Sequence, residues 1–246
     1  MDALIKILRA HGIMHQLTPI ESDPTIATLA VGGDAAIPMW RKLRGLVDKT
    51  GRWPIVLGSQ DDAEMMLADN AEMNAAPIAQ VIREAGAIDI FAWMRRRREM
   101  DPDYFESLDE GPWPGEVKRS SRYSLPYDVL THRPHPSVLI ALLATSVGAE
   151  APAYLRIGNW NDCPDAAVHV AFAEYWHKRY GAELVGVSHD IIEMAVPRPP
   201  TTREQAMILA REQFMYCSDI VDQGLESISN LGAYLLENDK WYFWWD

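Results

Sequence analysis

The pattern of apolar and polar residues divides the first hundred positions into short strands and longer helices. Residues 26–31 (IATLAV) and 53–57 (WPIVL) are continuous apolar runs typical of buried strands. Between them, apolar residues recur at helical spacing and predict a helix over 37–49, which Gly51 ends. A strand–helix–strand order of this kind is the usual way to build a pair of parallel strands.

A long helical pattern follows the second strand. Ser59 precedes three acidic residues, at 61, 62 and 64, and this arrangement is typical of a helix N-terminus. The pattern continues to about residue 100, with a break expected at Pro77, and ends with the four arginines at 95–98. Because cations favour a helix C-terminus and acidic residues follow at once, we interpret these arginines as a helix end rather than as a nucleic-acid site.

Residues 101–137 have a different character, since six of the sixteen prolines fall there. Proline removes a backbone donor and ends helices, so we expect a long irregular connection. His132 and His135 lie in it, and we interpret them as residues of a solvated loop rather than as metal ligands. The expected organisation is an N-terminal α/β part at 1–136, which includes this Pro-rich connection, and a C-terminal domain at 137–246.

The pattern beyond residue 137 predicts strands and helices in the order β-β-α-β-β-α-α-β. The predicted elements are strands at 138–145 and 154–157, a helix at 164–180, strands at 183–188 and 191–196, helices at 201–217 and 225–237, and a strand at 241–246. The whole chain is therefore expected to have an α/β or α+β fold, in which helices pack on a mixed sheet.

Charge and composition restrict the classes of partner. The chain has 35 acidic and 23 basic residues and a formal charge of −12, which argues against nucleic acid and anionic membranes as main partners. Its longest apolar run, at 138–144, is far shorter than the ~20 residues of a membrane helix. Two cysteines do not make a secreted disulfide scaffold, and no signal-peptide pattern is evident, so we expect a cytoplasmic protein.

Two loops of the C-terminal part carry residues that suit a site. Trp160, Asn161, Asp162 and Cys163 lie between a predicted strand and a helix, where α/β proteins bind ligands. The alternative is that Asn161 or Asp162 caps the helix and Trp160 packs beneath it.

The second loop, between two predicted helices, contains Asp219, Asp222 and Gln223. Its paired carboxylates suit acid–base chemistry or a hard cation, or else they belong to ordinary helix ends.

The last six residues, WYFWWD, alternate like a strand. Trp241, Phe243 and Trp245 point to one side, and Tyr242, Trp244 and Asp246 point to the other. Such a segment would aggregate if left free, so we expect it to be docked on the sheet with one face in the core. We also expect the fold to bring this strand beside the two loops and to form one cleft.

Three segments, WNDCPD at 160–165, YCSDIVDQG at 216–224 and WYFWWD at 241–246, closely resemble the bacterial family called domain of unknown function 4253. The resemblance covers about residues 155–246, and the stretch at 39–58 is similar to the upstream part of the same proteins. It implies a bacterial cytoplasmic protein with an α/β domain and implies no activity. The matching residues are Trp160, Asn161, Asp162, Cys163, Pro164, Tyr216, Cys217, Asp219, Gln223, Gly224, Phe243, Trp244, Trp245 and Asp246.

Our first hypothesis is a non-catalytic binding or interaction protein, similar in kind to an immunity protein that neutralises a toxin, with an aromatic and acidic cleft. It needs no cofactor or metal, and its partner is a protein or a small molecule rather than nucleic acid or membrane. The predicted binding residues are Trp160, Asn161, Asp162, Cys163, Asp219, Asp222, Gln223, Trp244, Trp245 and Asp246.

Two alternatives remain open. One is a hydrolase, which would use Asp162, Asp219 and Asp222 around a divalent cation, or Cys163 as a nucleophile with a histidine as its base. As a nucleophile, Cys163 would need a nearby imidazole such as that of His169 or His189, whereas an ordinary free cysteine is a small buried apolar residue. The other alternative places the function in the Pro-rich segment at 101–137.

Overall fold

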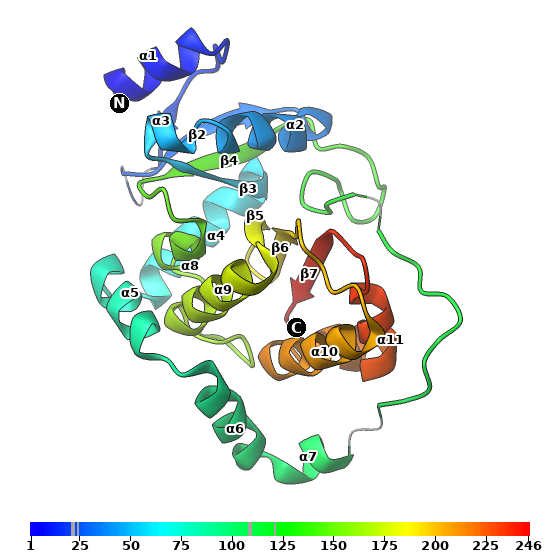
Figure 1. Cartoon of the computed structure of the whole chain (residues 1–246). Coiled ribbons are helices and arrows are strands. Elements are labelled where there is room, and N and C mark those ends of the chain that lie inside the picture. The colour runs from blue at the N-terminus through cyan, green and yellow to red at the C-terminus, as the bar shows by residue number, and fades with distance from the viewer. Residues whose placement is uncertain (21–22, 24, 108–109, 121) are drawn as a thin grey trace.

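The computed structural model describes residues 1–20, 23, 25–107, 110–120 and 122–246. Within them, seven strands form one mixed sheet in the order β1-β2-β4-β3-β5-β6-β7, with helices packed on it, which confirms the predicted fold class (Figure 1). The strands are β1 Thr18–Pro19, β2 Ala27–Val31, β3 Trp53–Ser59, β4 Val138–Leu143, β5 Glu183–Val187, β6 Ile191–Ala195 and β7 Lys240–Trp244.

The helices cover both faces of this sheet. They are α1 Asp2–Ala10, α2 Gly33–Arg44, α3 Val47–Thr50, α4 Gln60–Met73, α5 Ile78–Ala87, α6 Ile90–Met100, α7 Pro102–Ser107, α8 Ala151–Leu155, α9 Ala166–Tyr180, α10 Arg203–Tyr216 and α11 Ile228–Leu235. A short 3-10 helix (Gly148–Glu150) precedes α8, and a π-helix (Ile220–Leu225) lies between α10 and α11. No helix in the described ranges has the length and apolar character needed to cross a membrane.

The predicted parallel pairing of the first two long strands is wrong. β2 and β3 run in the same direction, but β4 lies between them and is antiparallel to both. The parallel neighbour of β3 is β5, through Val56 and Gly186. β4 begins about eighty residues after the end of β3 and inserts between β2 and β3. No local pattern in the sequence indicates such an insertion. The sheet therefore continues across residue 137.

The predicted strand at 154–157 is also wrong, because these residues end a short helix. Pro152 lies in the first turn of α8, and Arg156, with φ of 53°, ends it in the left-handed conformation. Ala153 and Leu155 are buried against the helical layer. Three of the four residues at 154–157 are apolar, and such a short run fits a buried helical turn as well as a strand, so the pattern alone does not decide.

β7 confirms the predicted alternation of the last residues. Trp241, Phe243 and Trp245 are buried, whereas Tyr242 is exposed and Trp244 is half-buried. The ring of Phe243 stacks on Trp176 of α9, with centroids 5.3 Å apart and planes within 6°. These aromatic contacts bury large areas, so they fix β7 and α9 to each other.

The irregular connection predicted at 101–137 is wrong at its start, where Pro102–Ser107 form the helix α7. The Pro-rich segment after α7 is irregular, as predicted, but it is tied to the body at both ends. Figure 1 shows it running past α11 toward the end of the sheet near α2. Arg119 donates hydrogen bonds to carbonyl oxygens at the end of α11, including 2.9 Å to Ala233. Further along, the buried carboxylate of Glu193 on β6 accepts bonds from the main-chain nitrogen of Ser124 (2.5 Å) and its hydroxyl (2.9 Å).

Candidate functional site

The loop before α9 is a tight turn that presents its polar side chains outward. The main-chain nitrogen of Cys163 donates to the carbonyl of Trp160 (2.9 Å), and Asn161 takes a positive φ of 43°. Gly158 makes the turn possible, since its φ is 89° and a Cβ there would lie 1.8 Å from the carbonyl oxygen of Pro164. Asp165 caps the helix by accepting from the nitrogen of Val168 (3.0 Å). Neither Asn161 nor Asp162 is needed as a cap.

The segment after α10 forms a π-helix, whose wide turn spreads its polar side chains. Asp219 accepts hydrogen bonds from the side chain of Gln223 (3.3 Å) and, on its other oxygen, from the nitrogen of Asp246 (3.0 Å). Asp222 is exposed and accepts from the hydroxyl of Tyr104 on α7. The two carboxylates of this loop therefore face different neighbours.

Hydrogen bonds join both loops to the end of β7. Asn161 donates to the main-chain oxygen of Asp246 (3.0 Å), and Ser218 donates to Asp162 (3.4 Å). The thiol of Cys217 donates to the carbonyl of Trp244 (3.0 Å). The structure thus brings together the three segments singled out in the sequence, and we call Trp160–Cys163, Asp219–Gln223 and Trp244–Asp246 the terminal surface.

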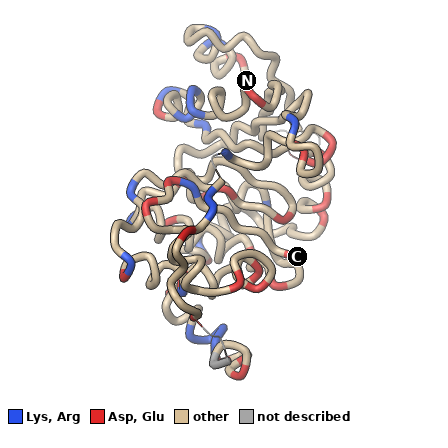
Figure 2. The backbone as a smooth tube through the Cα atoms, turned by 90° about the vertical axis from the view of Figure 1, so that its right-hand side faces the viewer, with Lys and Arg blue, Asp and Glu red and all other residues tan. Residues whose placement is uncertain are grey.

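Acidic side chains dominate the terminal surface. Asp162, Asp222 and Asp246 are exposed and Asp219 is half-buried, and Figure 2 shows acidic residues gathered around this end of the chain. Arg97 of α6 forms an ion pair with Asp162, whose side chain is still 55% exposed. One guanidinium leaves the charge of four carboxylates largely uncompensated, so the surface attracts cationic groups.

Aromatic side chains lie within and beneath this surface. Trp160 is half-buried and packs on the imidazole of His189, with ring centroids 4.9 Å apart. The indole nitrogen of Trp244 donates to Asp190 (3.1 Å). Cys163 and Trp245 are buried, so of the ten predicted binding residues these two support the surface from below.

Residues 139–246 match the family model described as domain of unknown function (DUF4253). This part of the chain is a DUF4253 domain. The finding confirms the family resemblance over residues 155–246 and extends it upstream to residue 139, within β4. Comparisons with curated proteins and with solved structures gave no match.

Beneath the terminal surface of the DUF4253 domain, a cysteine and a histidine lie within contact distance. The sulfur of Cys163 is 3.4 Å from Nε2 of His169, whose Nδ1 is 2.5 Å from the hydroxyl of Tyr216. Burial raises the pKa of the Cys163 thiol well above its usual value and lowers the pKa of His169 to about 3. Both groups are therefore neutral, unlike the thiolate and imidazolium of a cysteine hydrolase.

The DUF4253 domain offers no ligand set for the metal hypothesis. Among the described residues, no three histidine, cysteine, aspartate or glutamate side chains are placed to share one ion. Asp162 pairs with Arg97, and Asp219 and Asp222 are held by the different neighbours described above.

Two cavities among the described residues lie away from the terminal surface. One cavity of about 730 Å³ lies at the carboxyl ends of β3 and β5 and is lined by the Pro-rich segment, including Arg122, His132 and His135. Another, of about 630 Å³, lies between α6 and α10. None of the ten predicted binding residues lines either cavity. The long Pro-rich loop was the one feature of the sequence that pointed to the cavity of about 730 Å³. Nothing in the sequence indicated the cavity of about 630 Å³, because the residues that line it lie over a hundred positions apart.

Proposed function

We propose that this chain is a non-catalytic binding protein of the bacterial cytoplasm. In this proposal, the terminal surface holds a positively charged patch of a protein partner, in the manner of an immunity protein that masks a basic toxin. The likeness to immunity proteins is one of surface chemistry alone.

The observation that carries the proposal is the locked arrangement of carboxylates from three distant segments. Hydrogen bonds from Asn161 to Asp246 and from Asp246 to Asp219 fix the segments before any partner arrives. A surface that is already ordered loses little conformational entropy on binding, which favours affinity. The formal charge of −12 adds long-range attraction for a basic partner and raises the association rate.

Trp160 supplies the apolar contact that such an interface needs. It is half-buried, and its indole N–H donates to no partner among the described residues. Tryptophan often dominates the energy of interfaces when it is surrounded by polar residues, and here the surrounding residues are acidic.

Two further observations support a role without catalysis in the cytoplasm. The Cys163 and His169 pair is buried and neutral, so it does not supply a nucleophile. Both cysteines are free thiols, which suits a reducing compartment.

The test compares two variants with the same change of charge. Asp222→Asn with Asp246→Asn removes two exposed carboxylates of the terminal surface, and Asp61→Asn with Asp69→Asn removes two exposed carboxylates of α4. Partners captured from a bacterial lysate by the full chain are identified, purified and titrated by calorimetry at low and high salt. We expect the first variant to bind about 10-fold more weakly at low salt and the second to bind within 2-fold of the original protein.

The proposal is wrong if the terminal-surface variant binds the same partner as tightly as the α4 variant does. It is also wrong if Trp160→Ala, shown to be folded by circular dichroism, leaves the affinity unchanged.

The cavity lined by the Pro-rich segment favours a second candidate function, the binding of a small polar molecule. The carboxyl ends of parallel strands are the usual ligand position in such sheets, and a volume of about 730 Å³ suits a small ligand. A panel of small polar metabolites is screened by thermal shift. A ligand of this cavity raises Tm for the original protein and not for Arg122→Gln.

A further inference from the structure

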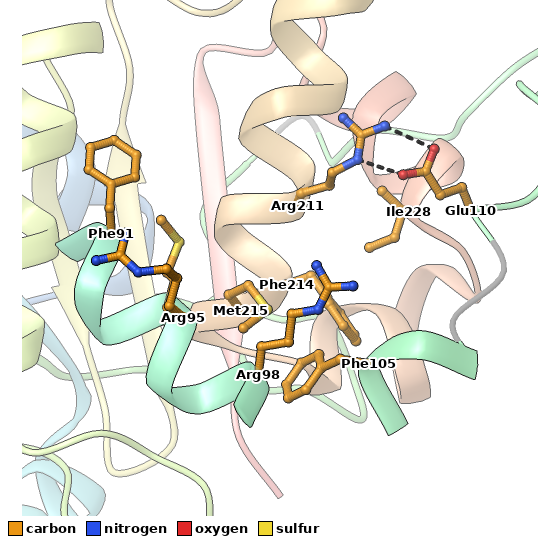
Figure 3. A pocket seen from close by; sticks show the side chains of 10 residues that line it. Phe91, Arg95, Arg98, Phe105, Glu110, Arg211, Phe214, Met215 and Ile228 are labelled. Atoms are coloured by element: carbon orange, nitrogen blue, oxygen red, sulfur yellow. Dashed lines mark hydrogen bonds and ion pairs between the residues drawn. The ribbon is translucent and has the colours of Figure 1, made fainter. Parts of the chain in front are cut away.

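A cavity of about 630 Å³ lies between α6 and α10, apart from the terminal surface. Figure 3 shows side chains from both helices, from α7 and from α11 facing this space. Its volume is within the range of sites that hold small organic molecules. The cavity uses segments more than a hundred residues apart, so the fold rather than a local motif builds it.

The charged groups of the cavity are mostly cationic. Arg95, Arg98 and Arg211 line it together with a single carboxylate, that of Glu110. Arg211 holds Glu110 with two hydrogen bonds, of 2.5 and 2.9 Å. Within the described ranges, Arg95 and Arg98 have no hydrogen-bonded or ionic partner. A chain with a formal charge of −12 therefore keeps a local excess of positive charge at this place.

The rest of the lining is apolar and aromatic. The rings of Phe105 and Phe214 meet edge to face, with centroids 5.8 Å apart, and Figure 3 shows Arg98 reaching over them from α6. Phe214 and Ile228 are buried, whereas Phe91 at the rim is 53% exposed. A guanidinium above an apolar floor can bind an anion while the floor covers the apolar part of the same molecule.

Neighbouring arginines of α6 point to different places. Arg97 pairs with Asp162 on the terminal surface, and Arg98 lines the cavity. Favourable interaction with the helix C-terminus accounts for positive charge on the last turn, but Arg95 lies one turn earlier. The helix end alone therefore does not account for Arg95.

We propose that this cavity binds a small organic anion, whose apolar body lies on Phe105 and Phe214 and whose anionic group contacts Arg98. The ligand class is an aryl phosphate or an alkyl carboxylate, since both combine one anionic group with an apolar body. The site is independent of the proposed protein partner, because no residue of the terminal surface lines it.

Calorimetric titration of the full chain tests the proposal with two defined probes. 1-Naphthyl phosphate represents aryl anions, and decanoate, below its micelle concentration, represents alkyl anions. 1-Naphthol, decanol and inorganic phosphate test whether the apolar body or the charge alone suffices. Arg98→Gln is compared with Arg96→Gln, which changes an exposed arginine of the same helix that does not line the cavity. Phe91→Ala provides a second variant at the exposed rim.

We expect at least one anionic probe to bind with a stoichiometry of one. The probe that binds more tightly shows whether the cavity prefers an aryl or an alkyl ligand. Arg98→Gln should weaken that probe about 10-fold or more, and Arg96→Gln should stay within 2-fold. Phe91→Ala should weaken it by a smaller factor. The proposal is overturned if neither anion binds below 1 mM, if both arginine variants behave alike, or if inorganic phosphate or the neutral analogues bind equally well.

Discussion

The side-chain amide of Asn161 donates a 3.0 Å hydrogen bond to the main-chain oxygen of Asp246, across 85 positions of the sequence. This bond, with the bond from Asp246 to Asp219, holds the end of β7 between two loops. The terminal surface therefore owes its shape to main-chain as well as side-chain partners.

Removal of the Asn161 side chain tests this relationship. Asn161→Gly preserves the positive φ of 43°, so we expect the free energy of unfolding to fall by about 1 kcal/mol from loss of the hydrogen bond. Asn161→Ala loses the same bond and also strains the backbone, so it should cost about 1 kcal/mol more. Urea denaturation measures both values, and equal stability of Asn161→Gly and the original protein would contradict the role of the bond.

The two thiols should be unreactive in the folded protein. Burial raises the pKa of Cys163 well above its ordinary value and raises the pKa of Cys217 to about 12, so both stay protonated at neutral pH. We expect Ellman's reagent at pH 8 to label neither thiol in native protein and both after addition of guanidinium chloride. Rapid labelling of Cys163 in the native protein would contradict this expectation and support the cysteine-hydrolase hypothesis.

His169 should make stability depend on pH in the acidic range. Burial lowers its pKa to about 3, compared with about 6.5 in an unfolded chain. Between pH 6.5 and pH 3, His169 is therefore protonated in the unfolded state and neutral in the folded state. The free energy of unfolding is highest above pH 6.5 and falls as the pH is lowered toward 3. Between pH 7 and pH 5, we expect His169 to account for a loss of about 2 kcal/mol.

Urea denaturation of the original protein and of His169→Gln at both pH values isolates this contribution. Other buried groups, such as Glu193 with its raised pKa, are common to the two proteins and cancel in the comparison. An equal loss of stability in both proteins would show that His169 is not the cause.

Glu193 should hold the Pro-rich segment on the sheet. Glu193→Gln loses the charge-assisted bonds from Ser124, so we expect the free energy of unfolding to fall by about 2 kcal/mol. The amide protons of Ser124 and Leu125 should exchange faster with solvent. Glu116→Gln, which changes an exposed glutamate in the same segment, should stay within about 0.5 kcal/mol of the original protein.

Gly158 should be irreplaceable in the turn before α9. A Cβ at this position would meet the carbonyl oxygen of Pro164 at 1.8 Å, so Gly158→Ala should destabilise the fold by about 3 kcal/mol or more. Gly86→Ala is the matched control, because it lies in α5 and its Cβ would meet nothing within 4 Å. Helix propensity predicts that this control gains about 0.5–1 kcal/mol, and thermal denaturation ranks the two variants.

Features that depend on neighbouring residues were predictable from the sequence. Ser59 accepts a bond from the nitrogen of Asp62 at the start of α4, and Gly181 ends α9 with a left-handed φ of 68°. The alternation at 241–245 also predicted which rings of β7 are buried. In each case the information lies within a few positions of the residue itself.

Features set by distant contacts were not predictable in the same way. The short, mostly apolar stretch at 154–157 fits a strand or a helix, and packing of α8 against α9 favours the helix. The two loops and the last strand were recognised as candidates, but only the fold shows that Asn161, Asp219 and Asp246 touch. No spacing in the sequence relates Arg98 to Phe214, which share a cavity wall.

The insertion of β4 between β2 and β3 has a consequence for the order in which the molecule can assemble. On the ribosome, residues 27–59 are synthesised long before residue 138. Until then, the edges of β2 and β3 that later pair with β4 have no hydrogen-bonding strand beside them. Arrival of Val138–Leu143 satisfies both edges at once. The first strand of the DUF4253 region thus completes the sheet of the amino-terminal half. We expect nascent chains that stop before this strand to be bound by chaperones or degraded.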